Sequence, residues 1–175
     1  ASGVLMLTAS VDTQDNRLAL MVVGWGIGME RWVVDHQVIP GDPSDERTWA
    51  ALDELLKARY RHPCGADLAI LATAVDSGGH HTDVFYQFFR LRRLRYVFPV
   101  MRASKPGRPV LAQRPSMVDV TWKGLTERNG AELWFIGTDT AKDWIYNRYP
   151  LEDGPGALHF ANDLPDDFFA QCVSE

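Results

Sequence analysis

Two apolar segments of this chain each end on an aspartate, and this pattern strongly limits how the chain can fold. Residues 4–11 (VLMLTASV) lead into Asp12, and residues 68–75 (LAILATAV) lead into Asp76. Apolar runs of this length, bounded by polar turns, predict buried β-strands. If the two strands are neighbours in one sheet, their carboxylates emerge side by side at one sheet edge.

Two adjacent carboxylates repel each other and lose solvation, so their pairing is costly unless a cation lies between them. A hard divalent metal ion with oxygen ligands fits such a position. The pattern therefore favours metal-dependent phosphodiester chemistry. The alternative is that Asp12 and Asp76 only form the turns that follow the strands, which is a common use of aspartate.

The composition is that of an ordinary globular domain. The chain has 175 residues, of which 46% are hydrophobic and 23% charged, enough for one domain with its own core. No apolar run approaches the roughly 20 residues that span a bilayer. Cys64 and Cys172 provide neither a metal-ligand spacing nor a disulfide framework, as expected in a reducing cytoplasm. The first residues (ASG) show no signal peptide and resemble the cut end of an excised domain.

Basic residues are concentrated in one stretch, although the net charge is −5. Residues 90–118 contain no Asp or Glu but eight basic residues: Arg90, Arg92, Arg93, Arg95, Arg102, Lys105, Arg108 and Arg114. A local positive stripe can hold phosphates whatever the total charge. The stretch therefore indicates a DNA-facing surface, or else a solvated helix end followed by an exposed basic loop.

The order of predicted elements is that of an α/β protein with a mixed sheet. We expect an antiparallel meander of strands at 4–11, 18–25 and 31–38, then a helix from Ser44 to about Tyr60. After the strand that ends at Asp76, we expect a helix from Thr82 to about Arg93. The remaining elements are a strand at 96–100, an exposed basic loop or hairpin at 103–115, a strand at 132–136, a helix from 137–139 to about 149 and a short strand at 157–160.

Several other polar residues have two interpretations. His80 and His81 could contact phosphate or move a proton, or could simply be polar residues at a helix start. Asp139 could cap a helix, or act as an auxiliary acid if its strand ends at the same edge. Lys142 could contact phosphate or be a solvated helix lysine. A further acidic group could supply a metal ligand or open a helix: Asp163, Asp166 and Asp167.

Six segments, in this order, resemble the nuclease domain of the GpA-type large terminase subunit of tailed bacteriophages. Each is weak alone, but together they cover nearly the whole chain. They are residues 7–14 (LTASVDTQ), 24–26 (GWG), 76–79 (DSGG), 136–143 (IGTDTAKD), 145–148 (IYNR) and 155–160 (PGALHF).

This resemblance implies a ribonuclease H-like mixed sheet, with three antiparallel strands followed by parallel strands and helices on both faces. Residues 1–175 would form a single nuclease domain, with the basic loop 102–118 as an elaboration. The resemblance implies a longer chain with an N-terminal ATPase, and that ATPase is not part of these residues because they contain no phosphate-binding loop motif. The nuclease domain would cut concatemeric viral DNA during genome packaging in the host cytoplasm.

The resemblance also implies a site. Asp12, Asp76 and Asp139 would be catalytic, and Asp12 and Asp76 would bind two Mg²⁺ or Mn²⁺ ions roughly 3.5–4 Å apart. A third acidic ligand would lie beyond residue 175, in an Asn-Glu-x-Leu-Asp pattern that this chain lacks, or near the C-terminus. Double-stranded DNA, the ATPase domain, the small terminase subunit and the portal would be partners, without a membrane. From the basic stretch, the expected DNA-binding residues are Arg92, Arg93, Arg95, Arg102, Lys105, Arg108 and Arg114.

Two other functions remain open at this point. The domain could be a non-catalytic docking module that contacts the portal, the ATPase domain or the small subunit. It could also be another ribonuclease H-like enzyme, such as a transposase or a junction resolvase, which would need the same acids. Segments 137–142 and 155–160 favour the terminase family over these enzymes.

Overall fold

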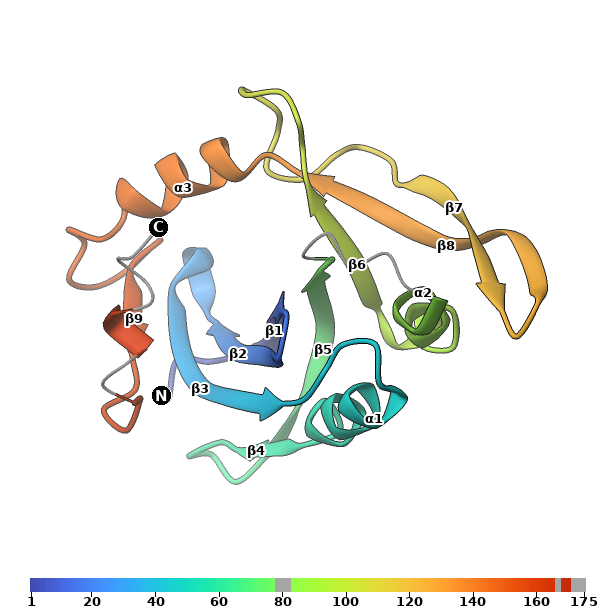
Figure 1. The fold of residues 1–175 in the computed structure, drawn as a ribbon. Coiled ribbons are helices and arrows are strands. Elements are labelled where there is room, and N and C mark those ends of the chain that lie inside the picture. The colour runs from blue at the N-terminus through green and yellow to red at the C-terminus, as the bar shows by residue number, and fades with distance from the viewer. Residues whose placement is uncertain (78–82, 166–167, 171–175) are drawn as a thin grey trace.

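One curved mixed sheet dominates the computed structural model, which describes residues 1–77, 83–165 and 168–170 (Figure 1). Its order is β7-β8-β6-β5-β1-β2-β3-β9, and β4 pairs with β5 outside this path. The strands are Met6–Gln14 (β1), Arg17–Trp25 (β2), Arg31–Pro40 (β3), Arg59–Arg61 (β4), Asp67–Asp76 (β5), Val97–Arg102 (β6), Ser116–Trp122 (β7), Leu125–Ile136 (β8) and Leu158–Phe160 (β9). The helices are Glu46–Leu55 (α1), Asp83–Arg90 (α2) and Thr138–Tyr146 (α3), with short 3-10 turns at Ile27–Met29 (η1) and Arg93–Arg95 (η2).

The strand directions define two edges of the sheet. β1, β2 and β3 form the expected antiparallel meander, and β5, β6 and β8 run parallel to β1 through successive pairings. The carboxyl ends of β1, β5, β6 and β8 therefore meet at one edge, which we call the carboxyl edge. The first residues of β3 and β9 pair at the opposite edge, which we call the amino edge. The predicted mixed sheet is confirmed.

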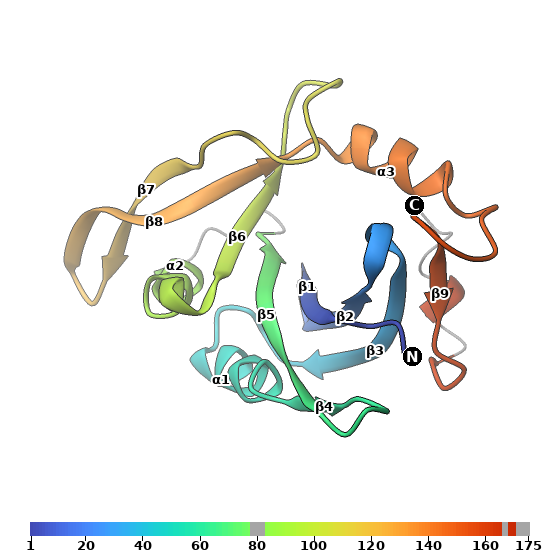
Figure 2. The ribbon, with the colours of Figure 1, turned by 180° about the vertical axis from the view of Figure 1, so that it is seen from behind.

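The helices lie on both sides of this sheet. α1 and α2 pack side by side against one face, and α3 lies on the other side of the strands (Figures 1 and 2). Alternate residues of β1, namely Leu7, Ala9 and Val11, are buried beneath α1 and α2. Trp49 of α1 joins the two helices, since its ring centroid lies 5.0 Å from that of Phe88 on α2. The face that carries residues 8, 10 and 12 of β1 therefore points away from α1 and α2.

The strands at the start of the chain are longer than the apolar pattern predicts. β1 continues through Asp12 to Gln14, and Asp12 pairs with Ala19 of β2 instead of opening a turn. The turn is formed by Asp15 and Asn16, and Arg17 starts β2. Backbone hydrogen bonds to β2 thus extend β1 beyond its last apolar residue, because a tight two-residue turn keeps the two strands in register.

The first predicted helix is shorter than expected. α1 ends at Leu55, and its N-cap is Asp45, whose side chain accepts from the Arg47 backbone N–H, so the prediction of Ser44 as cap is wrong. Tyr60 lies in β4, which pairs with the start of β5. Hydrogen bonds within residues 62–66 reverse the chain. The resulting hairpin gives β5 an additional partner.

The largest element that the pattern missed is the β7–β8 hairpin, which projects from the body of the sheet (Figure 1). Only 132–136 was predicted as a strand, but β8 begins at Leu125. Its outer half is mostly polar and exposed, so it lacks the apolar alternation that marks a strand. Lys123 and Gly124, both with positive φ, form the turn, which matches the two-residue turns of hairpins. The predicted loop 102–118 is in fact shorter, covering residues 103–115 between the end of β6 and the start of β7.

Other predictions concern the second helix and the C-terminal region. α2 ends at Arg90, before the predicted Arg93, and α3 ends at Tyr146, before the predicted 149. The predictions for Gly78, Gly79, His80, His81, Thr82, Asp166, Asp167 and Cys172 lie outside the described residues. In the part of the chain that the structure describes, none of the helices has the length and apolarity required to cross a bilayer.

Candidate metal and DNA site

Asp12 and Asp76 lie next to each other at the carboxyl edge. β1 and β5 are parallel, with Ser10 opposite Ala74 and Val11 opposite Val75, so the next step of the same register places Asp12 opposite Asp76. Neighbouring strands are about 4.8 Å apart. Val11 and Val75 are buried beneath the helices, so both aspartates point to the other face. The structure thus brings together the two acids that the sequence singled out.

A short chain of polar side chains orients the Asp12 carboxylate. Gln14, two residues along the same face of β1, donates its Nε2 to Oδ2 of Asp12 over 2.6 Å. Arg17 donates its Nε to Oε1 of Gln14 over 2.7 Å, which fixes the amide with its NH₂ group toward Asp12. Among the described residues, Oδ1 of Asp12 accepts no hydrogen bond. Gln14 was not predicted from the sequence, although its i+2 spacing from Asp12 in a strand was an available indication.

The backbone around Asp76 is fixed on its other side by β6. Asp76 lies opposite Val100 of β6, and the buried Ser77 donates its backbone N–H to the carbonyl of Val100 over 3.0 Å. The pairing therefore continues one residue past Asp76, and the half-buried aspartate is held on an ordered strand end instead of a loop.

The two carboxylates form a donor set that fits a divalent metal ion. Both supply hard oxygen atoms, which Mg²⁺ and Mn²⁺ prefer. They come from adjacent strands, and Asp12 is exposed. The bond from Gln14 supplies the kind of outer-sphere orientation that metal-ligating carboxylates have.

Asp139 is placed at the same edge but already has a structural role. Its Oδ2 accepts from the backbone N–H of Gly107 over 2.6 Å. Hydrogen bonds from the backbone N–H groups of Gly107 and Thr140, together with the charge of Arg102, keep the pKa of Asp139 below its usual value. The N-cap of α3 is Gly137, without a side-chain bond, so the prediction that Asp139 caps this helix is wrong.

The first turn of α3 therefore holds the basic loop 103–115. In addition to the Asp139 bond, Thr140 donates its hydroxyl to the carbonyl of Arg108 over 2.7 Å. Gly137 is needed at this contact, because a Cβ there would overlap with the same carbonyl oxygen. The loop is exposed, as predicted, yet it has a defined path beside the carboxyl edge.

The basic stripe of the sequence is divided between two regions. Residues 90–95 precede β6 and Arg102 ends it, so the two parts are separated by the length of a six-residue strand, or about 20 Å. The first part is engaged in ion pairs: Arg92 and Arg95 with Asp53, Arg93 with Glu132, and Arg90 with Glu127. These pairs connect the end of α2 to α1 and β8.

The second part of the stripe has the better position for a phosphate backbone. Arg102, Lys105, Arg108 and Arg114 are exposed, and no carboxylate of the described residues forms an ion pair with them. They lie on or after the strand that borders Asp76. The DNA-contact roles remain predictions, but the ion pairs make these four residues stronger candidates than Arg92, Arg93 and Arg95.

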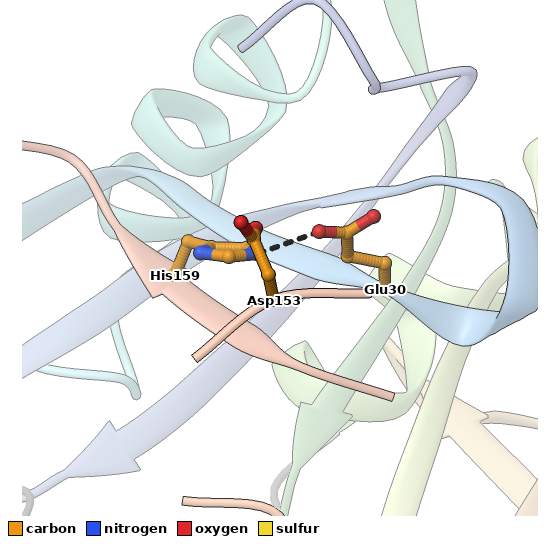
Figure 3. A group of neighbouring side chains, drawn as sticks. All are labelled: Glu30, Asp153 and His159. Atoms are coloured by element: carbon orange, nitrogen blue, oxygen red, sulfur yellow. Dashed lines mark hydrogen bonds and ion pairs between the residues drawn. The ribbon is translucent and has the colours of Figure 1, made fainter. Parts of the chain in front are cut away.

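A second group of potential metal ligands lies at the amino edge. Ligand atoms of Glu30, Asp153 and His159 are all within 4.8 Å of one another, and Figure 3 shows them converging from the start of β3, the preceding loop and β9. His159 Nε2 is 2.8 Å from Glu30 Oε1 and 4.0 Å from Asp153 Oδ1, and its ring stacks on Trp32. The Asp153 side chain is 94% exposed. This group was not predicted from the sequence, because its residues are far apart in the chain.

Comparisons with known proteins agree with the resemblance found in the sequence. The model of a family described as "Terminase large subunit gpA, endonuclease domain" matches residues 1–175. The chain is 39% identical to a terminase large subunit of Escherichia phage lambda over 94% of this chain and 25% of that protein. It is 34% identical to a terminase large subunit of Enterobacteria phage P21 over 98% of this chain and 26% of that protein. The chain thus spans about a quarter of the length of these relatives, and no solved structure matches it.

Proposed function

Because the chain belongs to the family of the gpA terminase large subunit endonuclease domain, we propose that it is a metal-dependent endonuclease that cuts viral DNA during genome packaging. The observation that carries the metal dependence is the register of β1 and β5, in which Asp12 and Asp76 are laterally adjacent. A docking module would not need two repelling carboxylates side by side on one exposed face.

In this proposal Asp12 and Asp76 hold Mg²⁺ or Mn²⁺. When bound, two such ions supply Lewis-acid activation of water and stabilisation of the leaving oxygen. The chain's own residues position the reaction: Gln14 keeps one oxygen of Asp12 occupied, so that the other remains directed to the ligand. Asp139 acts by holding the loop 103–115 through Gly107. We expect a third acidic ligand from outside the described residues.

The DNA would lie along the carboxyl edge, where the exposed cations at Arg102 and in the loop 103–115 would contact its phosphate backbone. Phosphate contacts position a duplex but do not read its sequence, so cutting by this domain should have weak sequence preference. In a packaging motor the site would be chosen by a small terminase subunit, and DNA would be moved by an ATPase domain and enter a portal. We propose these partners, and the host cytoplasm as the compartment, from the family.

The proposed function predicts nicking that depends on added metal. Supercoiled plasmid incubated with the protein and Mn²⁺ or Mg²⁺ should convert to open-circular and linear forms, and excess chelator should stop this conversion because the carboxylates alone cannot activate water. Restoring Mn²⁺ to the same sample should restore it. Cleavage that continues unchanged in chelator would contradict a metal-dependent mechanism.

The loop cations predict a specific loss of DNA affinity. Changing Arg102, Lys105 and Arg108 together to glutamine should weaken duplex binding and reduce the salt slope by up to about three, since each phosphate contact contributes about 0.9 to that slope. Fluorescence anisotropy over a series of salt concentrations measures both quantities.

The matched control for this triple variant is Arg93→Gln, which removes an arginine already paired with Glu132. It should leave the salt slope unchanged. A larger loss of slope in Arg93→Gln than in the triple variant would place the DNA on the other half of the basic stripe.

A further inference from the structure

An arginine at the amino edge of the sheet is buried, and none of the described residues gives it an acidic partner. Arg31, the first residue of β3, is 5% exposed. Its Nη2 donates to the carbonyl of Gly156 over 3.1 Å, and its Nε is buried with no hydrogen-bond partner in the part of the chain that the structure describes. The acid next to it in sequence, Glu30, is bound to His159. Within residues 1–77, 83–165 and 168–170, no carboxylate forms an ion pair with Arg31.

A second arginine adds to this unbalanced charge. Arg148, just after α3, places its guanidinium carbon 3.8 Å from the centre of the Trp144 ring, and the guanidinium carbon of Arg31 lies 4.2 Å from the same centre. Arg148 donates to the carbonyl of Trp144 and likewise has no acidic partner among the described residues. Burial and the charge of Arg148 both lower the pKa of Arg31.

The contacts that these arginines make do not compensate the charge. Arg31 faces the Trp144 ring and, at 5.8 Å, the Trp25 ring, but cation–π contacts recover only part of the cost of burying an unpaired charge. A pocket of about 610 Å³ opens beside Arg148, which lines it together with Trp144, Asn147 and Gly156 among others. Arg31 lies next to this wall through its bond to the Gly156 carbonyl. Gly156 permits this packing, because a Cβ there would lie 3.1 Å from Nε of Arg148.

We propose that Arg31 and Arg148 form a binding site for a phosphate group. Two guanidinium groups carry two positive charges and can offer several N–H donors. This matches the charge and geometry of a phosphate better than it matches those of a single carboxylate. The site is separate from the acidic pair. Arg31 is paired with Trp25 of β2, which is paired with Met6 of β1. Met6 lies six residues before Asp12 on β1, a distance of about 20 Å along the strand. The phosphate comes either from free phosphate or from a DNA backbone that crosses this face.

The test measures stabilisation by inorganic phosphate. The thermal midpoint of the protein is followed against phosphate concentration, with chloride keeping the ionic strength constant and acetate as a carboxylate comparison. We expect a saturable rise for the natural protein and for Arg128→Gln, an exposed arginine on the β7–β8 hairpin. In Arg148→Gln, the phosphate concentration at half-saturation should rise at least about tenfold, since one of the two charged donors is lost. Arg31→Met should abolish the response, and Arg148→Gln suffices if Arg31→Met does not fold.

A duplex oligonucleotide then identifies the source of the phosphate. If the duplex competes with inorganic phosphate for the natural protein but not for Arg148→Gln, the site binds the DNA backbone. If the duplex does not compete, the site binds free phosphate. Equal responses to phosphate and acetate, no response beyond chloride, or an unchanged response in Arg148→Gln would each overturn the proposal. These results do not depend on cleavage, which is tested separately through Mn²⁺-dependent nicking.

Discussion

Replacing Asp12 by asparagine should lower Mn²⁺-dependent nicking of plasmid DNA by roughly 10³-fold, the scale associated with losing one preorganised electrostatic group from an active site. The asparagine oxygen can still accept the bond from Gln14, which directs its NH₂ group toward the position of the ion. The variant therefore keeps the local hydrogen bond and loses a negative ligand. Initial nicking rates and the Mn²⁺ concentration needed for half-maximal rate measure the effect.

The matched control is Asp15→Asn, three residues away in the turn between β1 and β2. It removes the same charge from the same hairpin and should leave the nicking rate within about twofold, as for a surface change. Gln14→Ala should fall between the two, with a loss of about 10–100-fold, because it removes an orienting partner and not a ligand. Full activity in Asp12→Asn, with the folded state confirmed by circular dichroism, would exclude the acidic pair as the metal centre.

The acidic pair could be predicted because its information is local. Each aspartate follows an apolar run, and strand alternation determines the face to which it points. The parallel pairing of the two strands came from the family resemblance, and the structure agrees with it. The exposed loop 103–115 was also predicted correctly, since Pro and Gly among charged residues indicate exposed turns.

The basic stripe shows what local information cannot provide. Eight basic residues within 29 positions look continuous in sequence, but β6 runs from one sheet edge to the other and separates them. Arg92 and Arg95 bind Asp53, 39 and 42 positions away, and no periodicity reports a pairing at that distance. The same limit applies to the partners of Asp139 and to the group of Glu30, Asp153 and His159, because each depends on which loops meet in space.

Replacing Asp53 by alanine should have the largest effect on stability among the variants considered. Asp53 of α1 is 7% exposed, and its carboxylate lies 2.5 Å from Arg92, 2.7 Å from Arg95 and 2.9 Å from Lys57. Removing it leaves Arg92 and Arg95 close together without their counter-charge, whereas Lys57 keeps its ion pair with Glu54. Loss of one partner from a buried ion pair costs about 3–5 kcal/mol, and we expect about 3 kcal/mol because Arg95 and Lys57 are half exposed. Urea unfolding at pH 7 measures this loss.

The pH dependence of the difference between natural protein and variant tests whether charge is the cause. Burial alone would raise the pKa of Asp53, but hydrogen bonds from Arg92, Lys57 and Arg95 outweigh burial and hold its pKa well below the ordinary value. A group with a lowered folded-state pKa stabilises the protein fully above its unfolded pKa, about 3.9 for aspartate. The difference should therefore be constant from about pH 5 to 8 and shrink as the pH falls below about 4.

Glu54→Gln, which removes a neighbouring acid with a side chain that is 75% exposed, should change stability by less than about 0.5 kcal/mol. A difference for Asp53→Ala that does not shrink in acid would assign the loss to packing instead of charge.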